Sequence, residues 1–170
     1  MEKISINFNN QKINLKVRNE ADVSVMREIF KIREYKAVES IILSAVDPIF
    51  DVGAHAGFFS LYAWGLNKGV KIFALEPENN NLKFLRENLE LNNTGDCIEI
   101  VSGALAGKSG QRKLVLSEDS HNHYLSKEKG NVFSYSLSDF AKFFKVKKFS
   151  LIKMDIEGGE YEVFESLKEK

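Results

Sequence analysis

The sequence predicts an α/β fold: a doubly wound, mainly parallel sheet with helices on its faces. After Pro48, short apolar segments alternate with longer segments of helical periodicity. A glycine-containing turn, DVGAHAG, follows the first apolar segment. Acidic residues stand at the ends of two later segments, at Glu76 and Asp155. Alternation of strands and helices with these lengths is typical of parallel sheets that are covered by helices.

The expected elements follow one another in a regular order. The core strands are expected at residues 49–52, 70–75, 97–101 and 149–154. Helices are expected at residues 57–66, 80–91, 138–144 and 161–167, and Asn79 is predicted to be the N-cap of the second. Two shorter strands, at residues 113–116 and 132–135, flank a polar loop.

Residues 1–47 are expected to form an N-terminal extension ahead of a main domain, residues 48–170. Ile4, Ile6 and Phe8 alternate with polar residues, and the alternation resumes after an Asn-Asn-Gln turn. This pattern predicts a hairpin in which each strand has one buried face. From residue 22 to residue 46 the apolar period becomes helical, which indicates one helix followed by a second or a continuation.

The composition restricts the compartment and the partners. The 170 residues include 24 Lys+Arg and 24 Asp+Glu, so no global charge attracts nucleic acid or an anionic membrane. The first residues do not resemble a signal peptide, and no apolar run reaches the ~18 residues that span a bilayer. A single cysteine, Cys97, favours a reducing compartment. We therefore expect a cytoplasmic protein without a membrane span and without a nucleic-acid partner.

The glycine turn lies where ligands bind in such sheets, after the carboxyl end of a core strand. Gly53 permits the tight turn, and Gly57 permits the next helix to approach the sheet or a ligand. A dinucleotide favours a G-x-G-x-x-G turn, but His55 occupies the middle position here and would crowd a pyrophosphate. A carboxylate needs less room at the helix N-terminus, and Asp51 suits an amino group beside it. S-adenosylmethionine carries both groups and a ribose.

A ribose predicts an acidic residue at the end of the second core strand, and Glu76 is found there. The alternative is a structural corner with an exposed glutamate. At the end of the fourth strand, "LIKMDIEGGEYEVF" places Asp155 and Glu157 at the same edge of the sheet. These carboxylates could bind a substrate, take a proton from it or hold a metal. The alternative is a strand that runs out into solvent.

Together, "FDVGAHAGFFSLYA", "IFALEPENNNLKFLRENLELNN", "VSGALAG" and "SLIKMDIEGGEYEVFESL" resemble the FkbM family of S-adenosylmethionine-dependent methyltransferases. Arg33-Glu34-Tyr35, upstream, adds to the resemblance. The resemblance implies a class I, Rossmann-like methyltransferase fold. It implies that Asp51, Gly53 and Gly57 surround the methionine end of the cofactor, next to His55 and Phe58. It also implies that Glu76 holds the ribose, that Pro77 shapes that turn, and that the adenine is bordered by Ser102, Gly103 and Ala104.

The resemblance also implies an acceptor class. Characterised members of the family are mostly O-methyltransferases of sugars, glycolipids or secondary metabolites. N-methyltransferases commonly carry an Asn/Asp-Pro-Pro-aromatic turn after the fourth strand, whereas the prolines here are Pro48 and Pro77 and Asp-Ile-Glu stands there instead. An alcohol must lose a proton as it attacks the methyl group. A carboxylate can take that proton if burial raises its pKa, so Asp155 or Glu157 is the candidate base. The expected partner is therefore a small-molecule or glycan hydroxyl acceptor.

Two other groups of residues have simpler explanations. His121 and His123, in the polar loop, could supply a base or a metal pair, but such histidines are more often solvated. A basic run interleaved with aromatics could follow a phosphate backbone, but a helix end and an exposed strand flank explain it more simply. Its members are Lys142, Lys145, Lys147, Lys148 and Lys153.

The chain departs from the family in length. Class I methyltransferases have a seven-stranded sheet, whereas four core strands are expected here, so the domain is expected to be truncated after the fourth. An open sheet edge there would favour self-association. Three functions stay open: an O-methyltransferase or its cofactor half, a non-catalytic binding module with the same fold, and a nicotinamide-dependent oxidoreductase. His55 disfavours the last.

Overall fold

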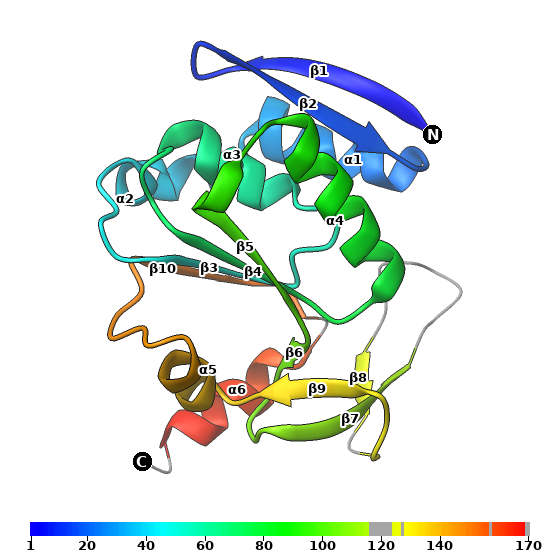
Figure 1. The fold of residues 1–170 in the computed structure, drawn as a ribbon, viewed down its shortest axis with the longest axis vertical. Coiled ribbons are helices and arrows are strands. Elements are labelled where there is room, and N and C mark those ends of the chain that lie inside the picture. Colours follow the sequence, from blue (N-terminus) through cyan, green and yellow to red (C-terminus); the bar gives the residue numbers. More distant parts are fainter. Residues whose placement is uncertain (116–123, 127, 157, 169–170) are drawn as a thin grey trace.

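The computed structural model describes residues 1–115, 124–126, 128–156 and 158–168 of the chain. Its centre is a parallel sheet of four strands in the order β10-β3-β4-β5 (Figure 1). The strands are β3 (Ile49–Val52), β4 (Ile72–Glu76), β5 (Ile98–Ser102) and β10 (Leu151–Met154). This sheet confirms the predicted fold class and the four core strands. The strand order reverses between β3 and β10, so a ligand site is expected beyond their carboxyl ends.

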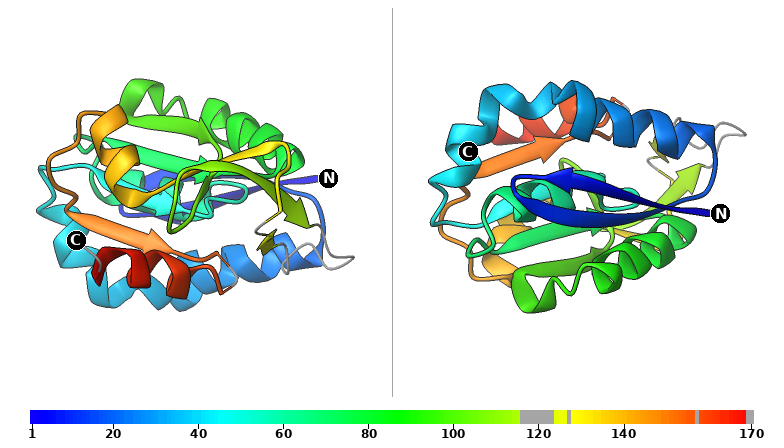
Figure 2. Two further views of the ribbon diagram at one scale, coloured as in Figure 1. Left: turned by 90° about the horizontal axis from the view of Figure 1, so that it is seen from below. Right: turned by 90° about the horizontal axis from the view of Figure 1, so that it is seen from above.

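One face of the sheet is covered by α3 (Phe58–Leu66) and α4 (Asn79–Leu91). A hairpin of β1 (Glu2–Phe8) and β2 (Gln11–Val17) lies over these helices (Figure 1; Figure 2, right). Because α3 lies between the sheet and the hairpin, it is apolar nearly all round. The predicted hairpin is confirmed, and it shares one apolar cluster with the sheet and its helices.

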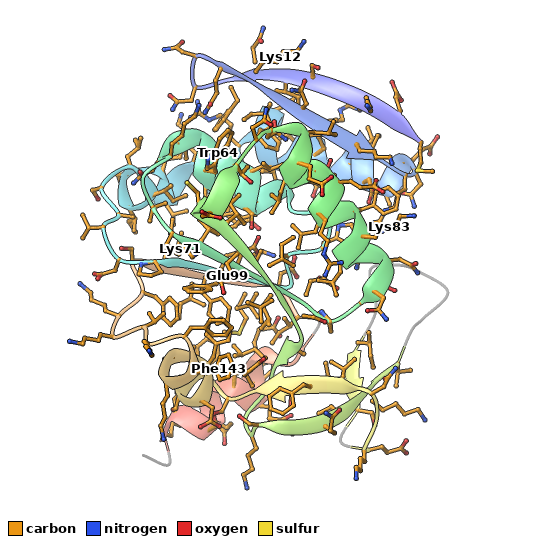
Figure 3. All side chains as sticks on the ribbon, viewed as in Figure 1. Lys12, Trp64, Lys71, Lys83, Glu99 and Phe143 are labelled. Carbon is orange, nitrogen blue, oxygen red and sulfur yellow. The ribbon has the colours of Figure 1, made fainter. Side chains whose placement is uncertain are left out.

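The opposite face carries α5 (Leu137–Phe143) and α6 (Glu160–Lys168) (Figure 2, left). Beside them lies a small sheet of β6 (Ala104–Leu105), β7 (Gly110–Val115), β8 (Tyr124–Ser126) and β9 (Val132–Tyr135). Aromatic side chains fill the space under α5: the Phe50 ring from β3 stacks on Phe140, with 4.1 Å between centroids. Phe143 of the same helix is exposed (Figure 3). Both faces of the core sheet are therefore buried, as its nearly continuous apolar strands require.

The N-terminal helical region differs from the expectation of one or two regular helices. It consists of α1 (Glu20–Arg27), a π-helix (Glu28–Ile32), a 3-10 helix (Glu34–Val38) and α2 (Glu39–Leu43). Arg33 adopts a left-handed conformation, with φ of 58°, and this interrupts the helical hydrogen bonds. The interruption turns the chain so that Tyr35 packs on Phe59 of α3, with 4.7 Å between ring centroids.

The predicted N-cap of α4 was wrong by one residue. Glu78 is the N-cap, and its carboxylate accepts hydrogen bonds from the backbone N–H groups of Asn80 and Asn81. Glu78 can do this because its backbone is extended, while Asn79 already belongs to the helix.

The short strands β6 and β8 had not been predicted. His121, His123 and Glu157 lie outside the described residues.

Strand β10 forms one edge of the core sheet, and its side chains are half-buried. The self-association expected at this edge stays a prediction. In the part of the chain that the structure describes, no helix has the length and apolar character needed to cross a bilayer.

Candidate functional site

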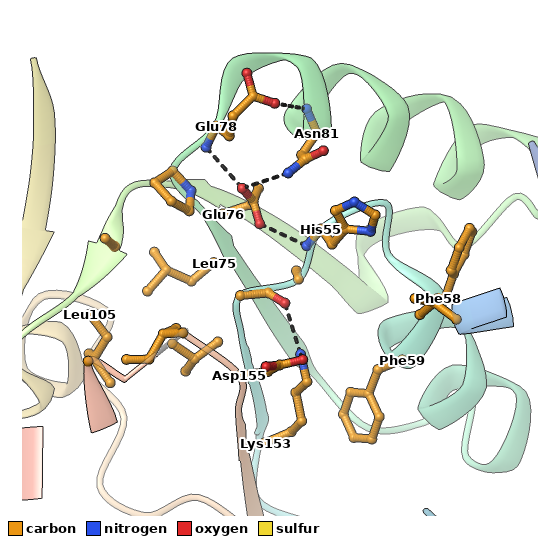
Figure 4. Close-up of a pocket in the computed structure, with 18 of the residues that line it drawn as sticks. His55, Phe58, Phe59, Leu75, Glu76, Glu78, Asn81, Leu105, Lys153 and Asp155 are labelled. Carbon is orange, nitrogen blue, oxygen red and sulfur yellow. Dashed lines mark hydrogen bonds and ion pairs between the residues drawn. The ribbon is translucent and has the colours of Figure 1, made fainter. Parts of the chain in front are cut away.

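A pocket of about 510 Å³ opens beyond the carboxyl ends of β3, β4 and β10 (Figure 4). This volume is within the usual range for sites that bind small molecules or cofactors. Its walls come from the glycine turn, the start of α4, the β5–β6 connection, the N-terminal helices, and Leu114 and Leu125 of the small sheet. The pocket therefore lies at the point where the strand order reverses, as the fold predicts.

The glycine turn forms the floor of the pocket. Gly53 has a φ of +74°, and a Cβ atom on it would lie 2.0 Å from the backbone oxygen of Asp155. The end of β3 therefore passes the end of β10 too closely for any side chain. Gly57 has a different role from the one predicted: a Cβ atom there would lie 2.4 Å from Leu85, so this glycine permits contact with α4 rather than with the sheet or a ligand.

Glu76, at the end of β4, is 4% exposed and faces the pocket. Its Oε2 accepts a hydrogen bond from the backbone N–H of His55 at 2.8 Å. Its Oε1 accepts bonds from the Glu78 backbone at 2.9 Å and from the Asn81 side chain at 3.3 Å (Figure 4). Burial raises the pKa of the Glu76 carboxyl, and these three bonds oppose the rise without cancelling it. The predicted alternative of an exposed glutamate is wrong.

A buried ion pair lies beneath the turn. The Asp51 side chain is fully buried, and its Oδ2 accepts a hydrogen bond from Ser60 at 2.6 Å. Its Oδ1 has no hydrogen bond and lies 3.3 Å from the Lys153 ammonium of β10. Lys153 also donates to the Gly53 carbonyl at 2.8 Å, so the ammonium joins β10 to the turn (Figure 4). The prediction that Lys153 lies on an exposed strand flank is wrong, because its side chain is 11% exposed and faces the same side of the sheet as Asp51.

The end of the pocket beside β10 brings together Asp155, Lys153 and Tyr35. The Asp155 side chain is 67% exposed, so the burial expected of the base is not found at this residue. Its Oδ2 lies 3.9 Å from the Lys153 ammonium. Burial raises the pKa of the Tyr35 hydroxyl, and the negative charges of Glu34, Asp51 and Asp155 raise it further. Tyr35 is therefore a neutral hydrogen-bond donor at ordinary pH, next to an accessible carboxylate.

The structure brings most of the predicted site residues together. The pocket is lined by Gly53, His55, Phe58, Glu76, Pro77, Gly103, Ala104 and Asp155. Asp51, Gly57 and Ser102 lie outside the lining, and Ser102 is exposed. Sequence reasoning did not identify Lys153 or Asn81 as part of the site. For Lys153 a signal exists, since it is a charged residue inside an otherwise apolar strand.

The described residues hold no cluster of three or more His, Cys, Asp or Glu side chains arranged for a metal ion. The pocket lining is acidic: it contains five carboxylates, and Lys153 is the only lysine or arginine among the described lining residues. The acidic residues are Glu28, Glu34, Glu76, Glu78 and Asp155. Such a lining favours a ligand that carries positive charge.

A parallel sheet of this order, with a glycine turn after β3 and a buried glutamate at the end of β4, defines a Rossmann-like α/β fold. Residues 51–170 match the model of the methyltransferase FkbM domain. The chain therefore belongs to the FkbM methyltransferase family. No curated protein sequence matches the chain significantly.

Several solved structures are similar in part. A methyltransferase FkbM from Methylobacillus flagellatus is 19% identical, with a TM-score of 0.47, over 72% of this chain and 29% of its own. A precorrin-6y C5,15-methyltransferase from Geobacter metallireducens is 28% identical, with a TM-score of 0.36, over 45% and 42%. P. horikoshii TYW2 in complex with MeSAdo is 23% identical, with a TM-score of 0.42, over 60% and 36%. The chain thus matches less than a third of the length of the first of these.

Proposed function

We propose that this chain binds S-adenosylmethionine and takes part in methyl transfer to a hydroxyl group of a sugar, glycolipid or secondary metabolite. The observation that carries the proposal is the Glu76 carboxylate, which is buried at the end of β4 and faces the pocket. A carboxylate has about four acceptor positions, and three hydrogen bonds from the protein leave one for a ribose hydroxyl.

The other residues of the pocket fit the same cofactor. The Gly53 turn would hold the methionine end, and the adenine would lie against Pro77, Gly103 and Ala104. The acidic lining suits a ligand with a sulfonium and an ammonium group. When bound, S-adenosylmethionine supplies an electrophilic methyl group. Because Asp51 lies beneath the turn, it would act by fixing Lys153 and the Gly53 carbonyl rather than by touching the cofactor.

In this proposal Asp155 is the base. Its carboxylate is accessible at the end of β10 and lies in the pocket, so it can accept the proton of a hydroxyl placed there. Tyr35 can donate a hydrogen bond to the same acceptor, because its raised pKa keeps the hydroxyl protonated. Phe59 and Ile29 supply apolar surface that restricts water. Glu157, outside the described residues, stays the second candidate base.

Replacing Asp155 with asparagine is expected to lower turnover about 100-fold and to change cofactor affinity less than about threefold, since only proton removal is lost. The measurement is methyl transfer from radiolabelled S-adenosylmethionine to a panel of sugar and phenolic hydroxyl acceptors, together with calorimetric binding. Asp47→Asn is the control, because Asp47 precedes the opposite end of β3. Unchanged turnover in Asp155→Asn would exclude Asp155 as the base.

Cofactor affinity is expected to depend on pH through Glu76. The folded protein raises the pKa of this carboxyl, and only the ionised form can accept the three protein hydrogen bonds and a ribose hydroxyl together. Affinity should therefore fall as the pH is lowered through that raised pKa. Glu76→Gln should remove this part of the dependence. If the parent and the variant show parallel pH profiles, Glu76 does not titrate in binding.

Two alternatives are tested by the same assays. A non-catalytic binding module would bind S-adenosylmethionine without transfer to any acceptor. A nicotinamide-dependent oxidoreductase would bind NAD instead. His55 disfavours NAD because it occupies the middle position of the glycine turn, where a dinucleotide needs a glycine. Its Nε2 lies 2.6 Å from Nη2 of Arg18. A pyrophosphate would have to displace that side chain.

A further inference from the structure

We infer that Arg18, which directly follows β2, is a positioning residue for the Glu76 carboxylate. Arg18 precedes residues 51–170, which match the family model, so the family assignment gives it no role. The inference rests on the proposed function, in which Glu76 binds the ribose. It assigns the N-terminal extension to the cofactor site rather than to a separate unit.

The Arg18 guanidinium makes contacts in three directions. Its Nε and Nη2 donate to the two carboxylate oxygens of Asp22, each at 2.8 Å. Its Nη1 donates to Oδ1 of Asn81 at 2.7 Å, and its Nη2 lies 2.6 Å from Nε2 of His55. Because a guanidinium can only donate, Nε2 of His55 acts as an acceptor in this arrangement.

Both residues that Arg18 contacts on the pocket side bind Glu76. Asn81 donates from Nδ2 to Oε1 of Glu76, and His55 donates from its backbone N–H to Oε2. The bond from Arg18 holds Oδ1 of Asn81 away from Glu76, so the amide must present its NH₂ group to the carboxylate. Without Arg18 the amide loses this preference, and its oxygen can rotate toward the carboxylate and repel it. Arg18 thereby positions both carboxylate oxygens of Glu76: Oε1 through Asn81 and Oε2 through His55.

Asp22 holds Arg18 in place. The Asp22 side chain is 1% exposed, and its two oxygens accept a bidentate bond from the guanidinium and a further bond from the Arg18 backbone at 2.8 Å. Burial alone would raise the pKa of Asp22, but the hydrogen bonds and charge of Arg18 lower it below its usual value. Because the buried Asp22 carboxylate holds one side of the planar Arg18 guanidinium, the group has little rotational freedom. Its other N–H groups therefore point in fixed directions.

Lys16 provides a matched control, because it joins the same two elements without touching the site. Its ammonium forms an ion pair with Glu87 of α4 at 2.5 Å. Both cations also lie over the ring of Phe84, Lys16 at 5.4 Å and Arg18 at 4.8 Å from its centroid. A variant at Lys16 therefore loses a similar β2–α4 contact and leaves Asn81, His55 and Glu76 unchanged.

The experiment is a calorimetric titration of S-adenosylhomocysteine into the full chain and into Arg18→Lys, Asn81→Ala and Lys16→Ala, each also combined with Glu76→Gln. Arg18→Lys keeps a cation for Asp22 but cannot reach His55 and Asn81 together. We expect Arg18→Lys to weaken binding about tenfold when Glu76 is present and less than about twofold with Glu76→Gln. Lys16→Ala should change affinity less than about twofold in either background, because its partly buried ion pair with Glu87 lies outside the pocket lining.

The dependence on Glu76 separates positioning from general support of the fold. Equal losses with and without Glu76, or no loss for Arg18→Lys, overturn the inference. If Arg18→Lys does not fold, Asn81→Ala replaces it in the double-mutant cycle with Glu76→Gln. An equal loss of affinity with Glu76 and with Glu76→Gln again overturns the inference. Failure of the parent chain to bind S-adenosylhomocysteine overturns the proposed function and the inference with it. If the parent chain binds S-adenosylhomocysteine but the losses of affinity from Arg18→Lys and Glu76→Gln are additive, the inference is overturned and the proposed function is not.

Discussion

Gly53→Ala is expected to abolish cofactor binding and to lower the free energy of unfolding by more than about 3 kcal/mol. A Cβ atom at residue 53 would lie 2.0 Å from the oxygen and 3.1 Å from the carbon of the Asp155 carbonyl. Both are backbone atoms at the ends of paired strands, so relief requires β3 and β10 to separate. Separation would also break the bond from Lys153 to the Gly53 carbonyl and move the floor of the pocket.

The control for this change is Gly95→Ala. Gly95 also has a positive φ, +58°, but nothing lies within 4 Å of a Cβ atom built there. This variant carries the backbone cost of about 1 kcal/mol without a clash. Urea unfolding and titration of S-adenosylmethionine should therefore show a large loss in Gly53→Ala and normal affinity in Gly95→Ala. Similar stability and normal affinity in both variants would contradict the close approach of β3 and β10.

Lys153→Met is expected to cost about 3–5 kcal/mol of unfolding free energy, the usual cost of breaking a buried ion pair. Asp51 is fully buried, and its Oδ1 lacks a hydrogen bond and depends on the Lys153 ammonium for compensation. The Gly53 carbonyl loses its donor at the same time. The methionine side chain retains most of the volume, so the loss of charge rather than a cavity determines the effect.

Addition of Asp51→Asn to Lys153→Met is expected to recover part of that stability, because no uncompensated charge then remains buried. Lys148→Met is the control: Lys148 pairs with Asp47 at 3.6 Å, and its side chain is 76% exposed. An exposed pair of this kind contributes about 0–1 kcal/mol. Equal effects of Lys148→Met and Lys153→Met in chemical denaturation would show that the Asp51–Lys153 pair does not stabilise the turn.

The sequence was sufficient for the sheet and the turn because their signals are local. Each signal spans only a few neighbouring residues: an apolar strand, the two glycines of the turn, or an acidic residue at a strand end. The four core strands formed at the expected places. Glu76 and Asp155 reached the pocket because parallel strands end at one edge of a sheet.

The rest of the site depends on contacts between distant segments. In the sequence, Lys153 is one more member of a basic run. In the structure, β10 pairs with β3 and this pairing places Lys153 beside Asp51. Arg18 and Asn81 are far apart in the chain and meet because the hairpin lies over α4. The helix break at Arg33 is equally hard to predict, since arginine rarely adopts a left-handed conformation.

The most direct test of S-adenosylmethionine binding at Glu76 is calorimetric titration of S-adenosylmethionine, and separately of NAD, into the folded chain and into Glu76→Gln. We expect saturable binding of S-adenosylmethionine, about tenfold or more weaker in Glu76→Gln, because the ribose loses a charged acceptor. We expect no binding of NAD. Binding of NAD, or no binding of S-adenosylmethionine by a chain whose fold is confirmed by circular dichroism, would contradict these expectations.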